Sequence, residues 1–257
     1  MRIRRLLLRP YWLITQWGID PRKMLRAFLG LPHYLCDLAR FRTQYHGRLG
    51  IQPCLHDWYE EGGATQREYF WQDLLVARMI FEAKPERHVD VGSRVDGFVS
   101  HVASFREIEV FDIRPITTHV PGIRFKQADL MSPVAERENY CDSLSCLHAL
   151  EHFGLGRYGD PIDPSGYERG IANMGALLRP GGTFYLSTPI GQARVEFNAH
   201  RVFDPHNLVE LVERRGLSLR SVTVISSSGD MRESSRNELK RLAESTYNLV
   251  IFIFTKH

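Results

Sequence analysis

HVDVGSRVDGF, residues 88–98, is the stretch of sequence that decides the fold of this chain. A short apolar run with the composition of a buried strand ends at Val91, and Gly92 begins a turn. A helical pattern then starts at Gly97. In open α/β sheets, ligands bind where such turns leave the carboxyl ends of the strands. The stretch therefore predicts a strand, a ligand-binding turn and a helix.

Downstream of this stretch, further apolar runs alternate with helical patterns. The alternation predicts a doubly wound, mostly parallel α/β sheet of about seven strands with right-handed crossovers. Because no clear helix separates the last two strands, we expect them to form an antiparallel hairpin at the sheet edge. The predicted strands are 88–91, 108–112, 123–128, 143–147, 183–187, 221–225 and 248–254, and the predicted helices are 97–105, 167–178 and 207–214.

Upstream of the sheet, the sequence predicts a boundary between two domains. Residues 65–68, TQRE, have the form of a capping box that starts a helix ending before Pro85. We therefore expect an α/β domain over residues 65–257, preceded by a basic helical extension over residues 1–64.

Charge is divided unevenly between these two parts. The chain has a net charge of +3, but residues 1–48 hold ten Lys/Arg and two Asp/Glu, a balance of +8, so the rest sums to −5. An acidic main domain disfavours a nucleic-acid partner. The extension is compatible with peripheral contact to anionic lipid or with solvated helix faces. Because Arg9 and Pro10 interrupt the first apolar run and no run approaches twenty residues, we expect a cytoplasmic protein.

The turn itself allows two kinds of nucleotide site. A dinucleotide site needs G-x-G-x-x-G, but the middle position here is Arg94, which would obstruct a pyrophosphate, so an NAD(P)-dependent oxidoreductase is disfavoured. S-adenosylmethionine has no phosphates and needs less bare backbone. The turn resembles motif I of class I S-adenosylmethionine-dependent methyltransferases, D-x-G-x-G-x-G, at Asp90 and Gly92. We interpret Arg94 as a partner for the methionine carboxylate.

Acidic residues also end the next two strands. Asp112 follows Asp90 by 22 residues and has two oxygens that can accept both ribose hydroxyls. By resemblance, Asp129 lies where the superfamily places a polar contact to adenine. The predicted cofactor-binding set is Asp90, Gly92, Arg94, Gly97, Asp112 and Asp129.

Two later segments extend the resemblance. Residues 143–153, SLSCLHALEHF, resemble motif IV and its continuation, and residues 178–187, LRPGGTFYLS, resemble the turn into the fifth strand of the superfamily. Residues 148–166 together with 198–203 further resemble the uncharacterised DUF268 proteins. No acceptor is implied by that resemblance.

The catalytic candidates are His148, Glu151 and His152. Methyl transfer requires alignment and sometimes removal of a proton, and an imidazole suits that task at neutral pH. A histidine bonded only to backbone is the structural alternative. The triplet also resembles a cation-associated one in some quinone-pathway O-methyltransferases, with Asp160 and Asp163 as possible oxygen donors. We predict no metal, because a helix start favours carboxylates without any ion.

The long loop 154–166 is rich in glycine and proline and predicts acceptor binding. The acceptor-binding candidates are Arg157, Tyr158, Asp160, Asn198, His200 and Arg201. We therefore expect methyl transfer to a hydroxyl or amine of a small polar molecule, with a sugar or cell-envelope glycan precursor favoured. A non-catalytic binding module with the same fold is the alternative.

Overall fold

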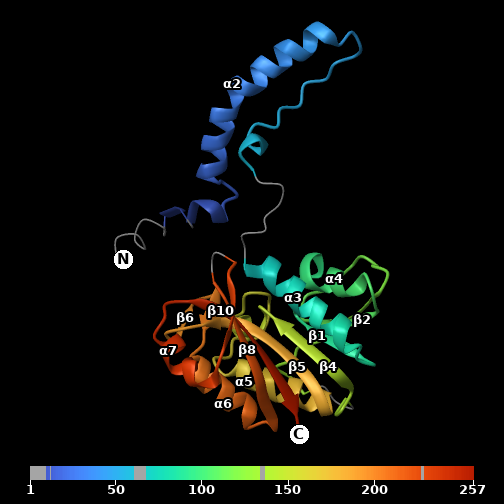
Figure 1. Cartoon of the computed structure of the whole chain (residues 1–257), viewed down its shortest axis with the longest axis vertical. Coiled ribbons are helices and arrows are strands. Elements are labelled where there is room, and N and C mark those ends of the chain that lie inside the picture. Colours follow the sequence, from blue (N-terminus) through green and yellow to red (C-terminus); the bar gives the residue numbers. More distant parts are fainter. Residues whose placement is uncertain (1–9, 12, 61–67, 134–136, 227–228) are drawn as a thin grey trace. The chain divides into compact units, whose positions relative to one another are not determined.

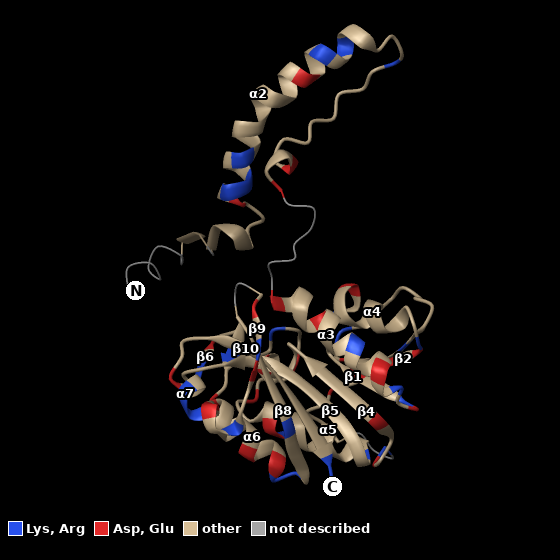
Figure 2. Cartoon of the chain, viewed as in Figure 1, with Lys and Arg blue, Asp and Glu red and all other residues tan. Residues whose placement is uncertain are grey.

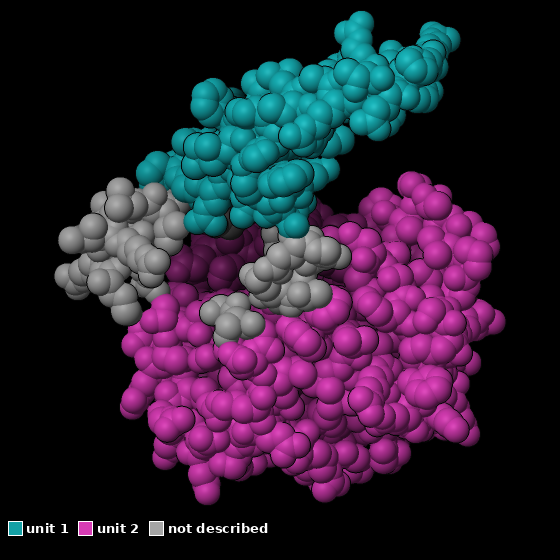
Figure 3. Space-filling model, turned by 45° about the horizontal axis from the view of Figure 1, so that its top comes forward, with its two compact units in different colours: residues 1–64 teal, residues 65–257 magenta. Residues whose placement is uncertain are grey.

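The computed structural model describes residues 10–11, 13–60, 68–133, 137–226 and 229–257 (Figure 1). It divides into two compact units, unit 1 over Met1–Ala64 and unit 2 over Thr65–His257 (Figure 3). Residues 65–67 of the predicted capping box lie outside the described residues.

Unit 2 is built on an eight-stranded sheet with the order β3-β2-β1-β4-β5-β10-β8-β9. The five strands from β3 to β5 are parallel, whereas β10 runs antiparallel between β5 and β8. The prediction of a doubly wound, mostly parallel sheet is confirmed. The strands are β1 (His88–Val91), β2 (Ile108–Asp112), β3 (Ile123–Gln127), β4 (Cys141–Leu147), β5 (Leu178–Ile190), β8 (Leu217–Ile225), β9 (Met231–Ser234) and β10 (Asn248–Lys256).

Two details of the predicted sheet are wrong. Strands β8 and β10 are antiparallel neighbours, but β10 lies inside the sheet and the short β9 forms the edge. The apolar run of β10 is buried on both faces, as a central strand requires. The sequence of β9 is polar and mostly exposed, so no hydrophobic alternation marks it.

Helices cover both faces of this sheet (Figure 1). One core cluster joins the sheet to α5 (Gly166–Leu177), α6 (Pro205–Glu213) and α7 (Leu239–Ala243). The other joins it to α3 (Glu68–Ala83) and α4 (Ser100–Ala103). The remaining short elements are η2 (Val95–Val99), η3 (Leu150–His152), η4 (Arg236–Glu238) and the hairpin of β6 (Arg194–Glu196) and β7 (His200–Val202).

Unit 1 contains the long helix α2 (Pro21–Gln44) and the short helix η1 (Asp57–Tyr59). Helix α2 begins after Asp20, whose carboxylate accepts hydrogen bonds from the backbone N–H groups of Arg22 and Lys23. Within the described part of the chain, no helix has the length and apolar character needed to cross a membrane.

Candidate active site

The turn after β1 has a backbone that only glycine suits. Gly92 has a φ of +71°, and its N–H donates to the carbonyl of Phe111 at 2.8 Å. A Cβ at this position would lie 2.9 Å from the Cβ of Ala149. Gly92 therefore lets the turn approach the segment that follows β4.

Asp90 holds this turn from inside the protein. Its buried carboxylate accepts hydrogen bonds from the Ser93 N–H at 3.0 Å, the Ser93 hydroxyl at 2.6 Å and the Ser145 hydroxyl at 2.5 Å. Burial raises the pKa of Asp90 to about 6. Asp90 does not line the cavity described below, and its hydrogen bonds shape the turn, so its predicted contact with the cofactor stays a prediction.

A cavity of about 530 Å³ opens at the carboxyl ends of β1, β2, β3 and β4. This is the edge of the sheet where the sequence predicts a ligand. Of the predicted site residues, the structure brings nine to the cavity wall, namely Gly92, Arg94, Asp112, Asp129, His148, His152, Arg157, Tyr158 and Asp160. It leaves Asp90, Gly97, Glu151, Asn198, His200 and Arg201 out of the wall.

On the β2 side of the cavity, Asp112 is paired with an arginine that the sequence interpretation missed. Its carboxylate accepts hydrogen bonds from the N–H, Nε and Nη2 of Arg114 at 2.8, 3.0 and 2.6 Å. The Arg114 guanidinium in turn lies over the Tyr158 ring at 4.4 Å. Oδ1 of Asp112 already accepts two of these hydrogen bonds, whereas Oδ2 accepts one and keeps a lone pair for a ligand.

The β1 turn also presents a charged pair to the cavity. Arg94 donates through Nε and Nη2 to the carboxylate of Asp96 at 3.0 and 2.6 Å, and both side chains are exposed. Arg94 is thus paired within its own turn, and its predicted pairing with a methionine carboxylate stays a prediction. Gly97 lies behind the wall against Asp73, where a Cβ would come 2.6 Å from a carboxylate oxygen.

His148 forms the wall where β4 ends. Its Nδ1 lies 2.7 Å from Oε1 of Glu151, and its ring packs on that of Tyr69 with centroids 4.2 Å apart. Its Nε2 is buried without a hydrogen-bond partner among the described residues, and the nearest carboxylate oxygen, on Glu68, is 4.0 Å away. A φ of +51° turns His148 out of the strand direction. Because its side chain bonds a carboxylate and not the backbone, the purely backbone-satisfied alternative does not describe it.

Glu151 is the buried partner of this imidazole. It is 1% exposed, and Thr188 donates a hydroxyl hydrogen bond to its second oxygen at 3.3 Å. Burial opposes ionisation of Glu151, but the His148 hydrogen bond, and the charge of either imidazole when it is protonated, outweigh it, so the pKa of Glu151 lies below the usual value. Glu151 does not line the cavity and lies behind His148.

The loop after η3 forms an aromatic and cationic side of the cavity. The His152 ring meets the edge of Tyr158 at 5.5 Å, and Arg157 lies over the same ring at 5.1 Å. Burial lowers the pKa of His152, which favours a neutral imidazole. Arg157 also donates to the carbonyl of Ala199 at 2.7 Å, so this loop is joined to the β6–β7 hairpin.

Several predicted acceptor-binding residues have structural roles in this structure. Arg201 is 5% exposed and donates to the carbonyls of Phe153 and Pro164 at 2.5 and 3.2 Å, so it clamps the loop. Asp160 reaches the wall but accepts from the N–H groups of Gly156 and Tyr158. Asn198 is exposed on the β6–β7 hairpin and His200 is half-buried beside it, and neither lines the cavity.

The sequence interpretation missed two further wall residues, Tyr69 and Arg114. Tyr69 lies in the first turn of α3, within the helix that the sequence predicts before Pro85. Burial, together with the carboxylates of Glu151 and Glu68, raises its pKa to about 12. Because Tyr69 is far from β4 in the sequence, no sequence pattern indicates that it contacts His148. Arg114 is only two residues after Asp112, so its pairing with that carboxylate could have been predicted.

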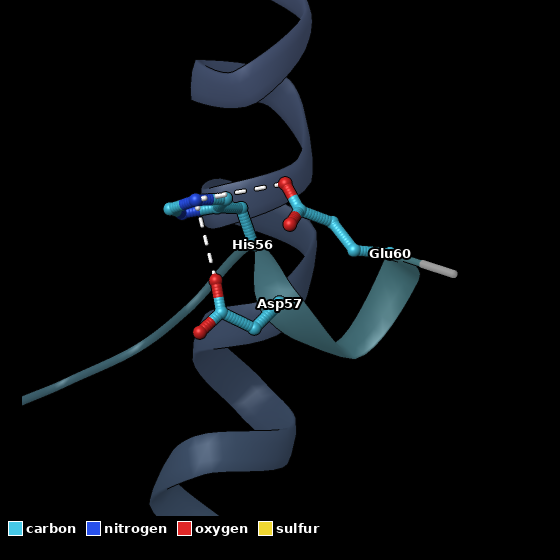
Figure 4. Close-up of side chains that lie close together, drawn as sticks. All are labelled: His56, Asp57 and Glu60. Atoms are coloured by element: carbon cyan, nitrogen blue, oxygen red, sulfur yellow. Dashed lines mark ion pairs between the residues drawn. The ribbon is translucent and has the colours of Figure 1, made fainter. Parts of the chain in front are cut away.

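Metal-ligating side chains converge elsewhere, in unit 1. Within the described ranges, His56, Asp57 and Glu60 are the one group of three whose ligand atoms all lie within 4.8 Å of each other (Figure 4). The His56 Nε2 is 3.2 Å from Asp57 and 3.7 Å from Glu60, as in ordinary surface ion pairs. The cluster holds no member of the predicted His148, Glu151 and His152 triplet.

Comparison with known proteins identifies the class to which this fold belongs. N-methyltransferase NodS from Bradyrhizobium japonicum, in complex with S-adenosyl-L-homocysteine, matches with a TM-score of 0.52 at 13% identity over 77% of this chain and 91% of that one. A Burkholderia thailandensis 1,6-didemethyltoxoflavin-N1-methyltransferase with the same bound molecule matches with a TM-score of 0.51 at 15% identity, over 74% and 80%. The chain has the class I methyltransferase fold, and the predicted resemblance is confirmed.

Two further comparisons bear on the family and on the range of the fold. The family model described as Caenorhabditis protein of unknown function, DUF268, matches residues 123–246, which confirms the predicted resemblance to it. The cyclase SpnF matches with a TM-score of 0.51 at 14% identity, over 72% of this chain and 81% of that one. No curated protein matches the sequence. The fold alone therefore does not decide the reaction.

Proposed function

We propose that unit 2 binds S-adenosylmethionine and transfers its methyl group to a hydroxyl or amine of a small polar acceptor. The observation that carries the proposal is the His148–Glu151 pair at the wall of a cavity that also contains Gly92, Asp112 and Asp129. The turn after β1, which suits the cofactor, and the His148 imidazole, which suits proton removal, thus line the same cavity. Class I neighbours with bound S-adenosyl-L-homocysteine support the same cofactor.

The wall residues divide between the two ligands. Asp112 and Asp129 offer carboxylate oxygens to the ribose and adenine, and Gly92 leaves room for them. Their accepted bonds from Arg114 and from the Met131 N–H hold these carboxylates in place. S-adenosylmethionine, when bound, supplies an electrophilic methyl carbon. The chain's task is then to orient the acceptor and exclude water.

His148 is the proposed general base. The step requires a shift of the side chains around His148 that uncovers its buried Nε2. Nε2 then takes the proton from the acceptor hydroxyl or amine as that atom forms its bond to the methyl carbon and the carbon–sulfur bond breaks. Glu151 keeps the Nδ1 proton in place and stabilises the imidazolium that results. An acceptor nitrogen or oxygen thereby gains a methyl group, and the sulfonium leaves as a neutral thioether.

Acceptor recognition falls to the loop residues that reach the cavity. Tyr158 offers a ring face, His152 a neutral imidazole and Arg157 a cation. Rings, polar donors and a cation of this kind suit a hydroxylated molecule, so we retain a sugar or glycan precursor as the proposed acceptor class. Asn198, His200 and Arg201 are no longer included.

A non-catalytic binding module remains the second candidate, because Arg94 and Asp96 form a charged pair in the turn where the superfamily motif has glycines. Titration calorimetry with S-adenosylmethionine, S-adenosyl-L-homocysteine and NADH tests the cofactor. A radiolabelled methyl group offered with fractionated small-molecule extracts then tests transfer. Absence of binding to both sulfur ligands contradicts the whole proposal, whereas binding without any labelled product favours the module.

A further inference from the structure

The chain after α2, residues 45–60 (the return segment), packs against one side of the helix. Gly30 is buried against the backbone of Leu55, where a Cβ would collide with the carbonyl. The ring of His33 stacks on that of Trp58, with centroids 4.9 Å apart and planes 6° from parallel. At about 100° per residue, Gly30 and His33 lie on the same side of the helix. The return segment therefore occupies that side.

The opposite side of α2 is apolar and uncovered. Phe28 is 75% exposed, and Met24 and Leu25 are 62% and 60% exposed. Leu29, Leu31 and Leu35 extend the same exposed surface. Large contiguous apolar surfaces of this kind mark sites of interaction with a membrane or a partner. We call these six residues the apolar face of α2.

Basic residues stand at both ends of α2, and the described acidic residues of unit 1 are divided between Asp20 and Asp37, at the start of the helix and within it, and Asp57 and Glu60 after it (Figure 2). Arg22, Lys23 and Arg26 lie in the first turns of α2. Arg40 and Arg42 lie near its end. On the return segment, Asp57 and Glu60 are paired with His56 (Figure 4). The apolar face is thus accompanied by positive charge on its own helix.

We propose that α2 lies along the surface of an anionic lipid bilayer, with its apolar face inserted among the acyl chains and its basic ends against the headgroups. An exposed apolar stripe with basic flanks is the combination that binds such surfaces. A second copy of the chain is a poorer occupant, because it would bring two stretches with a charge of +8 each into contact. This inference is independent of the chemistry proposed for unit 2.

The test is sedimentation of the full-length chain with vesicles of phosphatidylcholine alone or mixed with phosphatidylserine. We expect binding to the mixed vesicles that falls steeply as salt is added. Phe28→Gln with Leu35→Gln should weaken it by roughly tenfold or more, because two inserted side chains lose their apolar contact. Arg26→Gln with Arg42→Gln should weaken binding to mixed vesicles by about fivefold or more.

Matched controls distinguish binding through the apolar face from nonspecific binding through any exposed apolar or charged residue. Leu74→Gln with Phe81→Gln changes two exposed apolar residues of α3, and Arg214→Gln with Arg220→Gln removes two exposed charges from unit 2. Both pairs should bind vesicles like the unchanged chain. Circular dichroism checks that each variant is folded. Equal binding of the α2 variants and their controls, or no binding at all, overturns the proposal. The proposal is also overturned if the chain self-associates without lipid and Phe28→Gln with Leu35→Gln abolishes this association, because the apolar face is then an interface between copies.

Discussion

The Nδ1 of His148 lies 2.7 Å from a carboxylate oxygen of Glu151 that is almost completely buried. An ionised carboxylate only accepts hydrogen bonds, so Nδ1 carries a proton, and in the neutral imidazole Nε2 then keeps a free lone pair. The two residues are three apart in sequence, and η3 brings them together. The base and the group that orients it are therefore supplied by one short segment.

The first prediction concerns this base. His148→Asn should lower methyl transfer by roughly 10²–10⁴-fold, the usual contribution of a positioned base. Asparagine tolerates the positive φ at this position, so the backbone should survive the change. Cofactor affinity, measured by calorimetry, should change by no more than about twofold. His101→Asn, on α4 and exposed, is the control. Full turnover by the His148 variant would show that alignment alone carries the reaction.

The second prediction concerns cofactor affinity. Asp112→Asn should weaken binding of S-adenosyl-L-homocysteine by about 1–3 kcal/mol, because the ribose hydroxyls lose a charged acceptor. The change also releases Arg114, so Arg114→Gln is measured beside it. Glu109→Gln, on the same strand and outside the cavity wall, should leave affinity unchanged. Unaltered affinity in the Asp112 variant removes this residue from the site.

A third prediction contrasts two residues that we first assigned to the acceptor. Arg201→Met should lower the free energy of unfolding by about 2–4 kcal/mol, because buried carbonyls of the loop lose their donors. Amide exchange in residues 154–164 should accelerate. Asn198→Ala, at an exposed position, should change stability by no more than about 0.5 kcal/mol. Equal stability of the two variants would restore Arg201 as a candidate for the acceptor.

The sequence predicts the sheet well because its evidence is local. Apolar runs mark the parallel strands, and a residue just after such a strand must lie at the carboxyl edge, as Asp129 and His148 do. The direction in which a strand side chain points depends on residues that are distant in the sequence. Asp90 points inward because Ser145, on the neighbouring strand β4, receives it there.

The rest of the cavity depends on tertiary packing. Tyr69 reaches His148 only because α3 packs across the sheet. The helical pattern of α3 does not show whether a given side chain faces the cavity or the core. Arg201 is a charged residue after a glycine-rich loop, which suggested ligand binding. Its guanidinium instead satisfies the carbonyls of that loop, and a loop with so few side chains needs such an internal donor.

The last prediction concerns His88, the buried histidine that begins β1. Its Nδ1 lies 2.8 Å from the Ser143 hydroxyl and its Nε2 3.2 Å from that of Ser145. Burial lowers its pKa to about 3, whereas an unfolded histidine titrates near 6.5. Between these values the unfolded chain binds more protons. The free energy of unfolding should therefore fall as the pH drops below about 6.5, by up to about 1.4 kcal/mol per pH unit from this group.

Urea unfolding from about pH 8 to about pH 5 measures the effect as a difference between proteins. His88→Gln should be less stable at neutral pH. Its free energy of unfolding should fall less steeply on acidification than that of the unchanged chain, and the difference in slope should correspond to the uptake of about one proton. Groups such as Asp90 titrate in both proteins and largely cancel in the comparison. His101→Gln removes an exposed histidine and should keep the original slope. Parallel slopes for all three proteins would mean that folding does not lower the pKa of His88, which its two serine partners and its burial oppose.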